Sequence, residues 1–226
     1  MKAKKNLTLQ TIIALIFCPL LFTSLQKFDF NKQNSLNVPP YHLTPQLFKF
    51  ITLGYWPAAS DALWIGTLQK IGAKTFTPEL KQSTAEFYDL ATDLDPYFFE
   101  LYNQAGPTLS SLFHDGASAT LILQKGIRVY ENGLTQPKFW PTPFSLYLYQ
   151  AYIYAFLEND WAHAKATFLA ASEIKGAPYY LTEMKVWLKE EHSENELARR
   201  VLHMMINNTK DEDLKESYQE MLKKYE

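Results

Sequence analysis

The chain has 226 residues, of which 47% are apolar and 15% aromatic, so it can bury a core and does not have the composition of a disordered protein. A net charge of −2 without a basic stripe excludes the usual nucleic-acid binders. Cys18 is the only cysteine, which leaves the rest of the chain without disulfide or thiol chemistry. Hairpin-turn signals between alternating strands are absent, and the sequence predicts an all-α protein.

Residues 1–26 have the pattern of a targeting segment. Lys2, Lys4 and Lys5 precede the uncharged stretch 7–25, which as a helix of about 28 Å is just long enough to span a bilayer. We therefore predict an N-terminal transmembrane helix that stays attached as a signal-anchor. The lysines ahead of it predict a cytoplasmic N-terminus, with the body on the periplasmic or another extracytoplasmic side of the inner membrane.

Two alternatives for this segment remain open. A cleaved signal peptide needs small residues at its cleavage site, but Ser24 is paired with Phe22 at the candidate positions. A lipoprotein signal would use Cys18, where the preceding Phe17 stands in place of the small residue that is expected.

The rest of the chain divides into a short linker and a long helical region. Residues 27–43 are polar and carry paired prolines, and we expect a linker without chemistry of its own. The helical domain is expected over 44–226. Its helices are predicted at 45–56, 57–72, 78–93, 97–113, 115–131, 143–157, 161–175, 178–191, 194–207 and 211–225.

Residues 144–175 are the most informative part of this region. The segment 144–157 is apolar on nearly every face and too short to cross a bilayer, so we expect protein to surround it. Asp160 is a suitable N-cap for a second helix from Trp161. The pattern predicts a tight helical hairpin.

A signature of a small, a large and a small residue recurs along the chain, with starting positions separated by 35, 45 and 34 residues. Its members are Thr84/Tyr88/Ala91, Ala119/Leu123/Gly126, Ala164/Phe168/Ala171 and Ala198/Leu202/Met205. This spacing resembles the tetratricopeptide repeat (TPR), a 34-residue pair of antiparallel helices. The longer interval places a Pro-rich insert between Asn132 and Pro143, and the charged last helix is expected to cap the array.

The resemblance implies antiparallel helical hairpins stacked as a TPR-like right-handed solenoid, whose partner lies along the first helix of each hairpin. Five histidines are scattered without metal-ligand spacing, and no catalytic motif is present. We therefore expect no catalytic residue, no metal and no cofactor, and no enzyme.

The candidate partner-binding residues lie on two first helices and on the insert. Asn103, Gln104, Tyr149 and Gln150 belong to first helices that contain no Lys or Arg, unlike the TPR proteins that clamp a terminal carboxylate with basic residues. Phe139 and Trp140 belong to the insert. These two rings either fold back over the hydrophobic hairpin or project as a contact patch for a partner or the membrane surface.

The favoured hypothesis is a membrane-tethered TPR-like scaffold that mediates protein–protein interaction or the assembly of a cell-envelope complex. Its partners would be proteins and, through the N-terminal helix, the membrane, but not nucleic acid. The alternative is a stoichiometric structural subunit of a membrane-associated machine of the secretion or pilus type.

Overall fold

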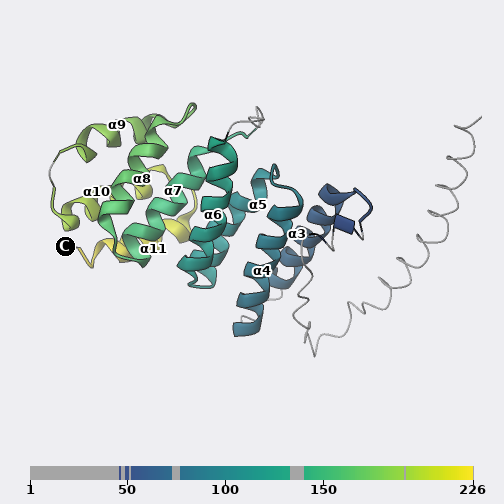
Figure 1. The fold of residues 1–226 in the computed structure, drawn as a ribbon. Helices are drawn as coiled ribbons and strands as arrows, with labels where there is room; N and C mark the ends of the chain where they lie inside the picture. The colour runs from purple at the N-terminus through teal and green to yellow at the C-terminus, as the bar shows by residue number, and fades with distance from the viewer. Residues whose placement is uncertain are drawn as a thin grey trace, which may run out of the picture. The chain divides into compact units, whose positions relative to one another are not determined.

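The structure, a computed structural model, describes residues 46, 49–50, 52–72, 77–132, 140–190 and 192–225. Every regular element within these ranges is a helix, and none is a strand, as the sequence predicts (Figure 1). Residues 43–226 form a compact unit of their own. The predicted anchor at 1–26 and linker at 27–43 lie outside the described residues. Among the helices described here, none is long and apolar enough to cross a membrane.

The helices follow the predicted order, with some changes at their ends. They are α3 (Trp56–Gly72), α4 (Pro78–Leu94), α5 (Phe99–Pro107), η1 (Thr108–Leu112), α6 (Gly116–Glu131), α7 (Phe144–Tyr152), η2 (Ile153–Leu157), α8 (Trp161–Glu173), α9 (Tyr179–Leu188), α10 (Glu194–Asn208) and α11 (Glu212–Leu222). The helices expected over 97–113 and 143–157 each end in a π-helical turn, η1 and η2.

Three hairpins account for most of the described chain. α3 packs on α4, α5 with η1 on α6, and α7 with η2 on α8, while α5 also contacts α4 and α7. Hydrogen bonds to side chains fix where the second helices begin. The Thr77 side chain accepts a hydrogen bond from the Leu80 amide, the Asp115 side chain from the Ser118 amide, and the Asp160 side chain from the His163 amide. Asp160 is the N-cap predicted from the sequence.

The second and third hairpins repeat each other in atomic detail. In η1 the Phe113 amide donates to the Thr108 carbonyl at 3.2 Å, and in η2 the Glu158 amide donates to the Ile153 carbonyl at 3.0 Å. The following residues, His114 and Asn159, have φ values of 50° and 52°. These left-handed residues reverse the chain before each capping Asp, so the hairpins share one turn geometry.

The predicted repeat signature marks the helix-to-helix contacts. Its positions are buried in all the repeats, except that Met205 is only partly covered. The small residues are needed where helices cross closely. A Cβ added to Gly126 would stand 2.7 Å from Cγ of the Tyr102 ring, and one added to Gly106 would stand 3.2 Å from Cβ of Tyr149.

The C-terminal part departs from the hairpin pattern. α9 is shorter than the expected 178–191 helix and packs on α8, where Lys185 Nζ lies 2.9 Å from Glu173 Oε1. α11 packs on α10 and also returns to the third hairpin, because the Tyr152 and Tyr218 rings are 6.4 Å apart. One face of the charged last helix therefore covers part of α7, as expected of a cap.

Candidate functional site

Two of the candidate residues join the first helices of successive hairpins. The indole nitrogen of Trp64 on α3 donates to Oε1 of Gln104 on α5 at 2.9 Å. The hydroxyl of Ser145 on α7 lies 2.7 Å from Oδ1 of Asn103 on α5. Both amide side chains are half-buried, and in each the second polar atom has no hydrogen-bond partner among the described residues. These amides therefore link α3, α5 and α7 and keep one polar atom each for a ligand.

Tyr149 lies beside these amides on the same pair of helices. It is half-buried and packs over Gly106 of α5, where the missing side chain leaves room for its ring. Burial raises the pKa of the Tyr149 hydroxyl, and the negative charge of Glu100 on α5 adds to the shift. The hydroxyl therefore stays protonated and can donate a hydrogen bond at neutral pH.

As a candidate partner-binding residue, Gln150 is expected to be exposed, and the structure contradicts this expectation. It is buried, and its Nε2 donates to Oη of Tyr154 at 3.2 Å. Nε2 of Gln124 on α6 donates to the same hydroxyl. One residue of a helix turns the side chain by about 100°, so Tyr149 is only half-buried while Gln150 is buried in the core. Gln150 supports the packing of α6 and α7 and is not a surface contact.

Trp140 folds back onto the protein, but onto the second hairpin and not onto the hydrophobic hairpin of residues 144–175. The ring is buried against those of Phe99, Tyr102 and Tyr130, with centroids 5.2, 5.7 and 6.2 Å away, and its nitrogen donates to the Tyr97 carbonyl at 2.9 Å. This part of the insert folds back onto α5 and α6. Phe139 lies outside the described residues.

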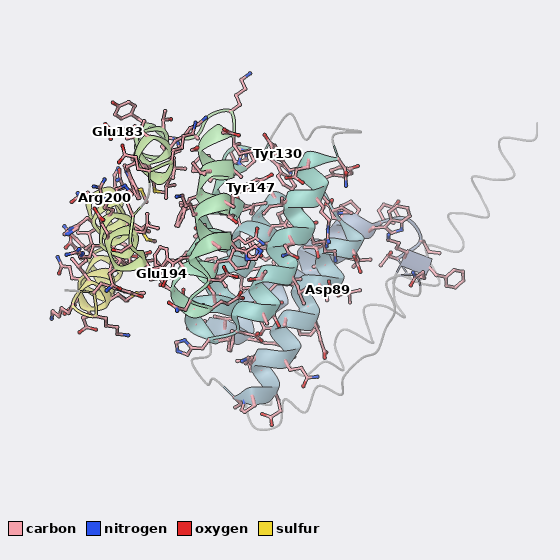
Figure 2. All side chains as sticks on the ribbon, turned by 60° about the vertical axis from the view of Figure 1, so that its left-hand side comes forward. Asp89, Tyr130, Tyr147, Glu183, Glu194 and Arg200 are labelled. Carbon is pink, nitrogen blue, oxygen red and sulfur yellow. The ribbon has the colours of Figure 1, made fainter. Side chains whose placement is uncertain are left out.

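The same region of α6 and α7 carries a second polar link. Figure 2 labels Tyr130 on α6 and Tyr147 on α7. These two helices pack against each other. The Tyr147 hydroxyl donates to Glu131 Oε1 at 2.9 Å. Burial raises the pKa of Tyr147, and this hydrogen bond adds to the shift, so the bond is kept at neutral pH.

The sequence did not single out two further half-buried tyrosines, Tyr180 on α9 and Tyr218 on α11. Burial is the main cause of the raised pKa of each hydroxyl, with the neighbouring Tyr149 as a second cause for Tyr180. For Tyr218 the pKa rises to about 12, with contributions from Tyr152, Tyr149 and Asp211. The Tyr218 ring lies 6.4 Å from that of Tyr152, so α11 brings this tyrosine beside α7.

We refer to Asn103, Gln104 and Tyr149 as the amide–tyrosine surface. It offers amide atoms and a protonated hydroxyl, and α5, η1, α7 and η2 contain no Lys or Arg. Within the described part of the chain, no group of three or more His, Cys, Asp or Glu residues could hold a metal ion. The chemistry of this surface suits reversible hydrogen bonding with aromatic contact.

Comparison with known proteins gives this chain no relative. No family model, no curated protein and no solved structure was found to match it. The resemblance to the tetratricopeptide repeat therefore rests on the repeat signature and on the hairpins of this chain alone.

Proposed function

We propose that this protein is a membrane-tethered scaffold of TPR type, in which hairpins stacked as a right-handed solenoid hold a protein partner in a cell-envelope complex. The observation that carries this proposal is the amide–tyrosine surface, which crosses the first helices of successive hairpins. The uncharged stretch 7–25 supports a tether in the inner membrane, and the lysines before it support an extracytoplasmic body.

An extended peptide is the ligand that best fits this surface. Amide side chains such as Asn103 can pair with peptide groups, and Tyr149 supplies contact area at a low cost in conformational entropy. The negative charge of Glu100 acts on Tyr149, and α5 and α7 contain no cation. We therefore expect a neutral or basic segment rather than a terminal carboxylate, and only weak dependence of binding on salt.

Cross-linking on native membranes followed by mass spectrometry would identify the partner, and Asn103→Ala would then test the surface. This substitution should weaken capture at least several-fold without unfolding the protein, because Ser145 keeps its contact with the Thr142 carbonyl at 2.8 Å. Asn195→Ala is the matched control, since Asn195 is an exposed amide on α10.

The opposite pattern would locate the partner elsewhere. If Asn103→Ala leaves capture unchanged while Phe139→Ser abolishes it, the insert binds the partner and the amide–tyrosine surface does not. Gln150 is unsuitable for this test, because its removal would disturb the core rather than the surface.

The structural-subunit alternative is favoured by a second observation. Ile65 and Leu68 are exposed on α3, and a Cβ added to Gly66 between them would meet no atom within 4 Å. A permanent neighbour in a membrane machine would cover such a face. Sedimentation of residues 43–226 separates the two functions, because a scaffold should be monomeric while a subunit with an uncovered apolar face should associate.

A further inference from the structure

A short turn and the first residue of α3 together expose an unusual concentration of large apolar side chains. Phe50, Leu53, Tyr55 and Trp56 are 77%, 65%, 75% and 42% exposed, respectively. The turn is held by its backbone, because the Leu53 amide donates to the Phe50 carbonyl at 3.2 Å and the Tyr55 amide donates to the Thr52 carbonyl at 2.9 Å. We call these residues, together with Lys49, the aromatic turn.

The composition of the aromatic turn fits the boundary between water and lipid. Tyr and Trp gather at that boundary, because each ring combines an apolar body with a polar group that stays hydrated. Lys49 Nζ lies 5.5 Å from the centroid of the Trp56 ring. A lysine at this position can bury its aliphatic stem beside the ring while its ammonium group reaches the lipid headgroups.

The distribution of charge along the chain points in the same direction. Residues 1–60 contain six lysines and a single acidic residue, Asp29, whereas the following part of the chain contains 16 basic and 23 acidic residues. No carboxylate occurs between Asp29 and Asp61, so nothing in the sequence around the aromatic turn repels anionic headgroups. The acidic remainder of the chain is disfavoured at an anionic surface.

The length of the preceding chain allows the contact. The predicted membrane-spanning stretch ends at Leu25, and 25 peptide units separate it from Phe50. Such a chain spans at most about 85 Å when fully extended, and it can equally be compact, so the turn lies within reach of the bilayer that would hold the stretch.

We propose that the aromatic turn inserts its side chains into the headgroup region of the bilayer and forms a second, interfacial contact with the membrane. This inference rests on the membrane tether of the proposed function. It adds that the body of the protein is held against the lipid surface at the start of α3, instead of moving freely at the end of the linker.

Lipid quenching of a fluorescent label tests this contact in the full chain. Because Cys18 is the only cysteine, Cys18→Ala gives a background in which Tyr55→Cys can be labelled with an environment-sensitive fluorophore. Tyr179→Cys is the matched control, since Tyr179 on α9 is also 75% exposed. The proteins are reconstituted in vesicles of phosphatidylcholine and phosphatidylglycerol that carry a nitroxide at a shallow acyl-chain carbon.

We expect the label at position 55 to emit at shorter wavelength and to be quenched several-fold more strongly than the label at position 179. Equal, weak quenching at both positions would overturn the inference. A blue shift at position 55 without lipid quenching would also overturn it, and would show that protein covers the turn. Labelling the native Cys18 tests the tether separately, because strong quenching there with none at position 55 would retain the tether and reject the interfacial contact.

Discussion

Gly126 provides the sharpest test of the helix packing. Its substitution by Ala places a Cβ 2.7 Å from Cγ and 2.8 Å from Cδ1 of the Tyr102 ring, and 3.1 Å from Cδ1 of Leu146. Carbon atoms are in favourable contact at about 3.5–4.0 Å, so the neighbours must move by close to 1 Å. Tyr102 is fully buried and its ring cannot swing into solvent, which makes the displacement expensive.

The expected magnitude is the difference of two opposing effects. Overpacking of a core costs about 1–3 kcal/mol. Replacing Gly by Ala inside a helix returns about 0.5–1 kcal/mol. Gly126→Ala should therefore lower the free energy of unfolding of residues 43–226 by up to about 2.5 kcal/mol. Urea titration followed by far-UV circular dichroism measures this change as a shift in midpoint at constant slope.

Two other glycines in the chain serve as internal controls. Gly66→Ala in α3 meets no atom within 4 Å and should stabilise the unit by about 0.5–1 kcal/mol, because only the helix effect remains. Gly106→Ala, with its closest contact at 3.2 Å, should fall between the other two. Equal stabilities for Gly66→Ala and Gly126→Ala would refute the close approach of α6 to Tyr102.

Two further predictions concern the aromatic residues. Trp140→Ala should lower the free energy of unfolding by about 3–5 kcal/mol in the same urea titration, and Trp140→Phe by clearly less, because the ring packs among three others; an unchanged midpoint for Trp140→Ala would show that the insert does not fold back. Folding also raises the pKa of Tyr218 to about 12 from an ordinary value of about 10. The unfolded chain therefore loses this proton first, so stability is complete below pH of about 10 and declines as the pH rises toward 12. Tyr218→Phe should flatten that decline in urea midpoints measured over this range, and a slope identical to that of the parent protein would contradict the assignment.

Local patterns in the sequence were sufficient to predict the helices and the pairing within the first three hairpins, whereas α9 packs on α8 and α10 on α11 instead of forming a fourth hairpin. The small residues of the repeat, such as Ala164 and Gly126, mark the places where helices cross, and both are buried in the structure. Asp160 begins α8 as expected, because capping depends on the next three residues and not on distant parts of the chain.

Which individual side chains are buried, and which of them contact one another, was decided only by tertiary packing. The stretch 144–157 is apolar all round, so its sequence has no stripe from which the buried position of Gln150 and the half-buried position of Tyr149 could be told apart. The contact between Tyr152 and Tyr218 depends on how α11 packs against α7, which is distant from it in the sequence. Helical periodicity is set by neighbours within four residues, whereas such contacts depend on the angles at which whole helices meet.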